Sequence, residues 1–228
     1  MRKIINIILA LCALALCYAC YASIYNDIAF DEEKAARENL VKARLMQIRD
    51  AEEKFKMSGH PEYCGDIDSL IDFVKNDRAV DHIVKQGELS DDQLESGMTE
   101  AEAIRKGIIK RDTVWVSAAE LLGIPNPDSL KYVPVGKEGA TIQLRKKAAF
   151  NLKSNEWDVF MEVRASLDDY LYGMDAKKLK NLKADMKKSG KNKADLFEDN
   201  ADDSKGEWYG LRMGDLQDPT NKNAGNWE

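Results

Sequence analysis

The chain opens on a long charge-free stretch, which reads IINIILALCALALCYACYASI over residues 4–24. Asn6 and Ser23 are its only clearly polar residues. As a helix, these 21 residues would extend about 31 Å, which matches the hydrocarbon core of a bilayer. We therefore expect residues 1–25 to form a transmembrane anchor.

Charges flank this stretch unequally. Arg2 and Lys3 precede it, whereas Asp27 and Asp31 follow it. Because positive residues are retained on the cytoplasmic side, this asymmetry predicts a cytoplasmic N-terminus and export of the rest of the chain. The sequence thus predicts a single-pass protein of the inner membrane whose body, from residue 27 onward, faces the periplasm.

Two other fates of the N-terminal stretch stay open. A cleaved signal peptide would use a small-x-small site such as Ala13-Leu14-Ala15, but the apolar run continues well beyond that site. Lipidation would need an aliphatic residue three positions before the modified cysteine, and Cys20 has Cys17 there. An uncleaved anchor explains the full length of the run better than either alternative.

The next stretch reads DEEKAARENLVKARLMQIRDAEEKFKM over residues 31–57 and contains neither Gly nor Pro. Its apolar residues recur at offsets of three and four, so they share one face of a helix. We expect residues 26–59 to form an amphipathic helical stalk, with a break near Asn26 to Asp31. The apolar face, called the stalk stripe below, needs a covering surface, either the protein's own sheet or a partner helix. Its members are Val41, Leu45, Ile48, Ala51 and Phe55.

Residues 60–190 alternate short helical and strand-like segments, which is typical of a small α+β head. The strand-like segments are rich in β-branched and aromatic residues and are separated by tight polar connections, so we expect an antiparallel sheet. Residues 87–97 read as a solvated loop. The expected strands are 79–84, 108–116, 132–135, 140–152 and 157–165.

Helix signals in this head are local and specific. Thr99 and Glu102 form a capping box that opens one helix, and Asp175 caps a lysine-rich helix that ends at Gly190. The remaining chain, residues 191–228, is a polar C-terminal segment with room for a last strand over 208–213. The expected fold class is therefore α+β: an anchor, a stalk and a head with an antiparallel sheet and short helices.

Charge excludes one large class of function. The chain carries 34 basic and 40 acidic residues, a net charge of −6. Since affinity for nucleic acid depends on neutralising phosphates, we expect no DNA or RNA partner.

The lysine-rich helix and the acidic residues after it are segregated by sign. They could dock neighbouring copies of the chain, bind an anionic surface such as lipid headgroups or a polyanionic glycan, or form a solvated helix beside an acidic loop. The lysines are Lys177, Lys178, Lys180, Lys183, Lys187, Lys188, Lys191 and Lys193, and the acids are Asp195, Glu198, Asp199, Asp202, Asp203 and Glu207.

Candidate catalytic and metal sites are weak. His60, Cys64 and His82 are residue types that bind zinc, but no two of them form a closely spaced ligand pair within one element. Neighbouring acids such as Asp168 and Asp169 are typical of a solvated surface. We expect no catalytic residue, no metal and no cofactor.

Three tryptophans offer a second ligand hypothesis. Trp157, Trp208 and Trp227 could form a platform for carbohydrate, although Trp157, lying in an expected strand, is better placed in the core.

Cys64 is the one cysteine outside the apolar stretch. Pro61 and Gly65 flank it and predict a turn near the surface, where a partner could reach the thiol. An unpaired exported cysteine either bonds to another chain or is sequestered, and we expect sequestration while keeping an intermolecular disulfide open.

Five segments carry a resemblance to a known group of proteins. The chain resembles an uncharacterised family of single-pass, periplasm-facing envelope proteins of the Bacteroidota. The resemblance implies a short anchor, a helical stalk and a small α+β head, with no activity or catalytic residue to carry over. The segments are LMQIRDA at 45–51, SLIDFVKN at 69–76, TEAEA at 99–103 with GIIKRDT at 107–113, and NAGNWE at 223–228.

The layout is also similar to that of type IV pilins and pseudopilins. In both, an apolar N-terminal helix continues as an amphipathic helix and leads into a sheet. The chain departs from those proteins because no Gly precedes the apolar run and no Glu lies within it.

These features together predict a non-catalytic, membrane-anchored envelope protein that acts through protein contacts of its stalk and head. The partner would be another envelope protein or a second copy of the chain, for example as a pilin-like assembly subunit. The alternative is a membrane-tethered ligand-binding or enzymatic domain.

Overall fold

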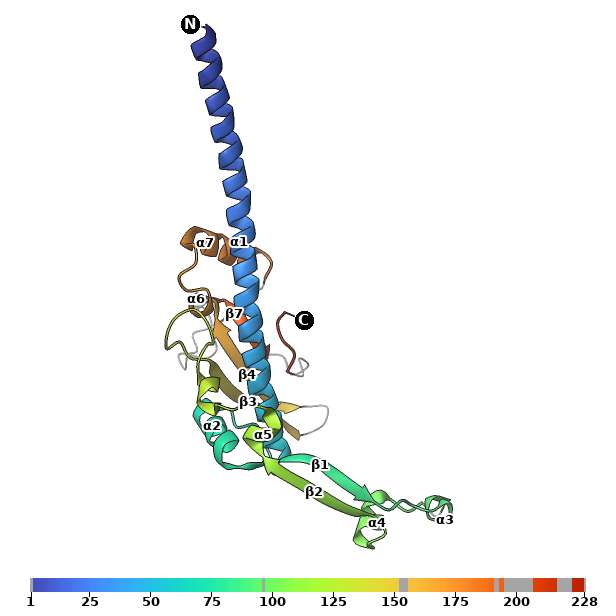
Figure 1. The fold of residues 1–228 in the computed structure, drawn as a ribbon. Coiled ribbons are helices and arrows are strands. Elements are labelled where there is room, and N and C mark those ends of the chain that lie inside the picture. Colours follow the sequence, from blue (N-terminus) through green and yellow to red (C-terminus); the bar gives the residue numbers. More distant parts are fainter. Residues whose placement is uncertain are drawn as a thin grey trace. The chain divides into compact units, whose positions relative to one another are not determined.

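The fold is α+β, as the sequence predicts, with helices of very different length and short antiparallel strand pairs (Figure 1). The computed structural model describes residues 2–95, 97–151, 156–190, 193–194, 207–216 and 223–227. Most of residues 191–206, the first part of the predicted polar segment 191–228, lies outside the described residues. The predicted domain boundaries at residues 25, 59 and 190 stay predictions.

The chain divides into two compact units, and each is described by itself. Unit 1 comprises Met1–Ala43, Val133–Ala140 and Ala165–Leu211. Unit 2 comprises Arg44–Tyr132, Thr141–Arg164 and Arg212–Glu228.

Helix α1, Arg2–Met57, is unbroken and contributes its first part to unit 1 and its last part to unit 2. The break predicted near residues 26–31 is wrong. Asn26 and the acidic residues after it have modest helix propensity, but no Gly or Pro removes a helical hydrogen bond there. An ion pair one turn apart, between Arg37 and Glu33, adds local support.

Unit 1 packs α6, Leu167–Tyr170, and α7, Ala176–Lys188, beside α1 (Figure 1). The Arg37 guanidinium on α1 donates to the backbone carbonyls of Tyr170 at 3.2 Å and Tyr172 at 2.9 Å. Asp175 caps α7 as predicted, since its carboxylate accepts from the Lys178 amide at 2.9 Å. Two short strands, β5 (Lys193–Ala194) and β6 (Glu207–Trp208), pair antiparallel in the same unit.

After the last part of α1, unit 2 continues with a helix and a hairpin. Asp66 caps α2, Ile67–Asn76, and the chain then forms β1, Arg78–Gln86. β1 pairs antiparallel with β2, Lys110–Ser117, with an irregularity between Val80 and His82. The predicted strands at 79–84 and 108–116 are thus confirmed.

Short helices interrupt and follow this hairpin. The capping box of Thr99 and Glu102 is present at the start of α4, Glu100–Arg105. The predicted loop at 87–97 is partly wrong because it contains a short helix, α3. The other bounds are α3 Asp91–Glu95, α5 Ala118–Leu122 and the 3-10 helix η1 Pro127–Lys131.

A three-stranded sheet has the order β3-β4-β7. β3, Gln143–Asn151, and β4, Glu156–Ser166, are antiparallel neighbours, which confirms the two predicted strands. The predicted last strand is present in two pieces, β6 and β7, Gly210–Gly214. The expected strand at 132–135 is reduced to one isolated bridge, between Tyr132 and Thr141. Pro134, which follows two residues after Tyr132, has no N–H to donate to a ladder.

Glycines bound β7 at both ends because a neighbouring backbone comes very close. A Cβ atom at Gly210 would collide with the carbonyl oxygen of Ala165. A Cβ atom at Gly214, whose φ is +78°, would collide with the carbonyl oxygen of Met161. Each end of the strand therefore requires a residue without a side chain.

Candidate interaction surfaces

The stalk stripe lies on α1, and the protein itself buries most of it. Val41 in unit 1 and Leu45, Ile48 and Ala51 in unit 2 have no exposed surface, and Phe55 is half-buried. The protein's own residues therefore exclude most of the stripe from water, without another chain. Its use as a contact for a partner protein stays a prediction.

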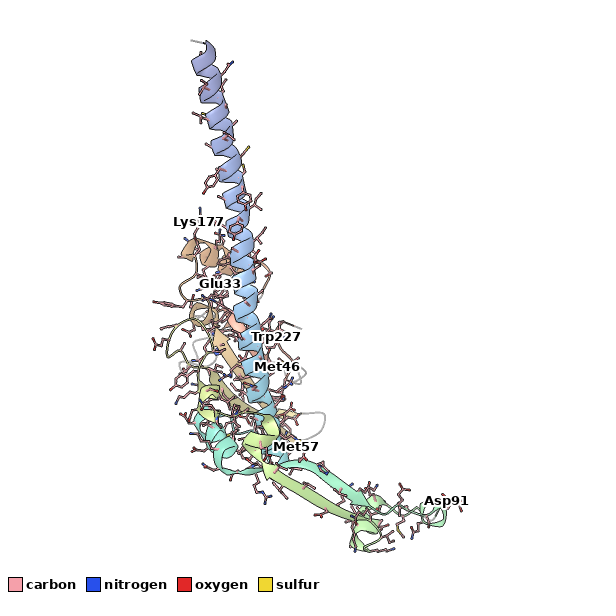
Figure 2. The ribbon with its side chains drawn as sticks, in the orientation of Figure 1. Glu33, Met46, Met57, Asp91, Lys177 and Trp227 are labelled. Carbon is pink, nitrogen blue, oxygen red and sulfur yellow. The ribbon has the colours of Figure 1, made fainter. Side chains whose placement is uncertain are left out.

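The beginning of α1 contrasts with the stripe. Within the described residues, one helix is long and apolar enough to cross a membrane, and its most apolar window is not buried at all. Large apolar side chains from Ile5 to Ile28 are exposed around the helix, as Figure 2 shows for the first turns. Tyr21 and Tyr25 stack with ring centroids 6.1 Å apart near the end of the charge-free stretch. Such aromatic pairs are typical of the level where a span meets water.

The β1–β2 hairpin carries exposed apolar side chains on one face. Within the part of the chain that the structure describes, these strands form a sheet of two. Ile83 is 54% exposed and Trp115 is 39% exposed. Ile83 lies opposite Thr113, two residues from Trp115, so both side chains stand on the same face. We call Ile83 and Trp115 the hairpin face.

Both ends of this hairpin are held in place. At its base, Ala79 is fully buried and the Arg78 guanidinium donates to the Trp115 carbonyl at 2.7 Å. At its far end, Glu100 of α4 pairs with Lys85 at 2.9 Å and with Arg111 at 2.8 Å. These hydrogen bonds lower the pKa of the Glu100 carboxyl. The hairpin face is thus an exposed apolar surface on a fixed support.

A second exposed aromatic site lies at the turn end of the β3–β4 hairpin. Trp157 is directly opposite Phe150, and the two rings meet edge to face with centroids 5.5 Å apart. The expectation that Trp157 lies in the core is wrong, because it is 69% exposed at the end of its strand. Trp208, another member of the predicted tryptophan platform, is buried.

Cys64 lies in a loop that is fastened to α1 by a buried carboxylate. Glu52, with no exposed surface, accepts from the backbone amides of Cys64 at 2.7 Å and Gly65 at 2.8 Å. Burial raises the pKa of the Glu52 carboxyl, and the two amide hydrogen bonds partly offset this. The Cys64 thiol is half-buried and donates to the Asp66 carbonyl at 3.4 Å, and burial raises its pKa as well.

Sequence reasoning missed a buried charged cluster in unit 2. Glu162 on β4 and Asp215 after β7 are both buried, and the Arg212 guanidinium lies 2.7 Å from the Asp215 carboxylate and 3.9 Å from that of Glu162. The Leu216 amide also donates to Glu162 at 3.2 Å. In the sequence, Glu162 lies between two apolar residues of a strand. The usual alternation of buried and exposed positions would therefore predict that Glu162 is exposed, and no other sequence signal indicates that it is buried.

Both histidines contact side chains that are close to them in the sequence or in the fold. His60 stacks on Phe55 with centroids 3.7 Å apart and meets Phe73 edge-on. His82 is exposed and lies 2.9 Å from the Asp81 carboxylate. Over the described ranges, no three His, Cys, Asp or Glu side chains gather as a metal site would require.

Comparisons with protein-family models, with curated proteins and with solved structures give no match for the chain.

Proposed function

We propose that the protein is a membrane-anchored, non-catalytic envelope protein that acts through protein–protein contacts. The observation that carries this proposal is the hairpin face, Ile83 and Trp115, exposed on a two-stranded support. A partner that covers this face would remove two large apolar side chains from water, which favours association. Tryptophan is also among the residue types that contribute most to protein interfaces.

The exposed pair of Trp157 and Phe150 supports the same conclusion. An exposed edge-to-face aromatic pair offers a large apolar area at a low cost in side-chain entropy. The stalk stripe, in contrast, is already buried, so the contact role proposed here falls mainly on the hairpins and not on the stalk.

The location of these contacts follows from the proposed topology. The basic N-terminal flank and the acidic residues after the apolar stretch favour an inner-membrane protein with its body in the periplasm. We further propose that the chain is related to envelope proteins of the Bacteroidota and that it acts as a pilin-like assembly subunit, with a second copy of the chain as its partner.

Site-specific photocrosslinking in the native membrane tests the proposal. A benzophenone side chain would replace Trp115 or Trp157, and Tyr172, which is 61% exposed in unit 1, would serve as the control position. We expect a discrete adduct of the same partner from both hairpin positions and none from Tyr172. No adduct, or the same ladder of adducts from all three positions, would contradict the proposal.

The buried cluster of Glu162, Arg212 and Asp215 favours a second candidate, a ligand-binding or enzymatic domain tethered to the membrane. Functional sites often hold charges away from water, although structural ion pairs do the same. Replacement of Glu162 by Gln distinguishes the two roles. Because Glu162 accepts from the Leu216 amide and lies near Arg212, a structural pair predicts lower thermal stability, whereas unchanged or higher stability would support a ligand site.

A further inference from the structure

The lysine-rich helix α7 is fixed to α1 just after the apolar stretch ends. The Lys178 ammonium donates to the Asn26 carbonyl at 2.6 Å and pairs with the Asp27 carboxylate at 2.8 Å. It also lies 5.3 Å from the centroid of the Phe30 ring. These residues all belong to unit 1, and Figure 1 shows α7 beside this part of α1.

This attachment point has a defined depth relative to the proposed bilayer. Asn26 is two residues beyond Ile24, which is about 3 Å along a helix. The headgroup layer on each side of the hydrocarbon core is roughly 5 to 7 Å thick. The stacked Tyr21 and Tyr25 mark the same boundary. The first turn of α7 is therefore held at the level of the lipid headgroups.

The sides of α7 differ in burial and in ion pairing. Its apolar residues, Leu179, Leu182 and Met186, share one side and are half-buried. The lysines that flank this side each pair with an acid of the same unit: Lys178 with Asp27, Lys183 with Asp168, and Lys187 with Glu207.

The opposite side of α7 carries exposed positive charge. Lys177 and Lys180 are exposed, and neither is in a salt bridge within the described residues, although the capping Asp175 carboxylate interacts electrostatically with Lys177. Lys188 extends the same side and is largely exposed, with Asp185 at 3.5 Å. In Figure 2, Lys177 lies at the end of α7 that is nearer to the N-terminal turns of α1.

We propose that the Lys177 and Lys180 side of α7 binds the anionic phospholipid headgroups of the membrane that α1 enters. This inference rests on the proposed anchoring of the protein. Lipid is favoured over a soluble polyanion because the contacts of Lys178 place the helix at headgroup depth. Pairing of Asp27 with Lys178 also neutralises the acid nearest the membrane, which reduces its repulsion of anionic lipid.

The contribution of each lysine is large enough to measure. A lysine near an anionic membrane surface strengthens association roughly fivefold, and about 1 M salt shortens the screening length to about 3 Å and removes the effect. Because the body as a whole is acidic, the attraction should depend on this local surface and not on the net charge.

Hydrogen–deuterium exchange of the full chain in lipid nanodiscs tests the inference. One disc type contains phosphatidylcholine alone, and the other also contains about 30% phosphatidylglycerol, enough to charge the surface. We expect the amides of α7 to exchange several-fold more slowly in the anionic discs and to lose this difference in high salt. Equal exchange in the two disc types would overturn the inference.

A matched pair of variants assigns the effect to these lysines. Lys177→Gln with Lys180→Gln should abolish most of the lipid-dependent slowing, because glutamine keeps helix propensity and removes the charge. The control, Lys106→Gln with Lys110→Gln, removes the same charge from exposed lysines of unit 2 and should keep the slowing. A loss of slowing in both double variants would contradict binding by α7.

Carbonate extraction separates this inference from the proposed function. A chain that resists extraction but shows no lipid-dependent exchange is anchored without the α7 contact, so the inference alone fails. A chain that alkaline carbonate releases is not anchored, and both proposals then fail.

Discussion

Residues 5–28 and residues 41–55 belong to one unbroken helix, α1, yet they differ in how their apolar side chains are distributed and covered. In the first segment apolar residues occupy every side and are exposed, whereas in the second they lie mainly on one side, where four of them are fully buried. Charged residues fill the other sides of the second segment. The comparison shows that pattern, more than apolar content, decides whether a stretch of helix suits lipid or a protein core.

The largest effect should come from placing a charge within the stalk stripe. Leu45→Asp or Ile48→Asp puts a carboxylate in a fully buried site, and we expect unit 2 to lose its cooperative unfolding transition. Truncation of either residue to Ala should cost about 2 to 4 kcal/mol. Thermal melts of the detergent-solubilised protein measure both effects, with the more exposed Met46→Asp as the control. Wild-type melting of both Asp variants would show that the stripe is not a core element.

A charge in the first segment should instead affect anchoring. Leu11→Arg and Leu14→Arg each oppose insertion by about 2.5 to 3.5 kcal/mol near the middle of a span. We expect the double variant to be lost from the carbonate-resistant membrane fraction. Leu40→Arg, on an exposed position beyond the apolar stretch, should remain in that fraction.

The intact mass of the membrane-bound protein checks whether this segment is retained. We expect the uncleaved chain, with its N-terminus before the apolar stretch. A mature N-terminus near Leu16 would instead support cleavage as a signal peptide.

A smaller effect should come from Glu52, the buried carboxylate of the second segment. In Glu52→Gln an amide NH₂ replaces one carboxylate oxygen and faces a backbone N–H donor, so we expect a loss of about 1 to 3 kcal/mol. Glu53→Gln, on the exposed side, should have little effect.

The pH dependence of this loss follows from the raised pKa of Glu52. A carboxyl whose folded pKa exceeds its unfolded value binds its proton more tightly in the folded state. Its linkage contribution is therefore complete below the unfolded pKa and is lost as pH rises through the folded pKa. We expect urea unfolding from pH 7 down to about pH 4.5, near the ordinary glutamate pKa, to show that the free energy of unfolding of wild type increases relative to that of Glu52→Gln as pH falls. A constant difference would argue against a raised pKa.

The smallest expected effect is that of the cysteines on dimer formation. Cys12, Cys17 and Cys20 are exposed on the apolar part of α1, while Cys64 is half-buried. With all three replaced by Ser, we expect monomer alone on non-reducing gels, because burial keeps the Cys64 thiol protonated and poorly reactive. A reducible dimer that disappears in Cys64→Ser would instead establish an intermolecular disulfide.

Local signals explain what could be predicted from the sequence. The capping box at Thr99 and the cap at Asp175 depend on residues three positions apart, and both are present. The stalk stripe follows from helical periodicity within one segment, and four of its five residues are fully buried.

The features that were missed depend on distant neighbours. Trp157 is a large apolar residue in a strand, which is typical of a core position, but it is exposed because it lies at the end of a hairpin. Glu162 and Asp215 come together through pairing in the sheet, which brings an arginine to both of them. The proposed role of α7 likewise depends on a contact between Lys178 and Asn26 of α1, which lie more than a hundred residues apart in the chain.

The glycines that bound β7 have a consequence for inherited variation. Every single-base missense change in a glycine codon introduces a side chain, and at Gly210 or Gly214 even a methyl group would meet a backbone carbonyl that cannot move without distorting the neighbouring strand. These two codons should therefore tolerate synonymous changes alone. In a saturation library selected for folded protein, both positions should be depleted of all nineteen alternatives, whereas Gly97, where a Cβ atom would meet open space, should accept at least Asn.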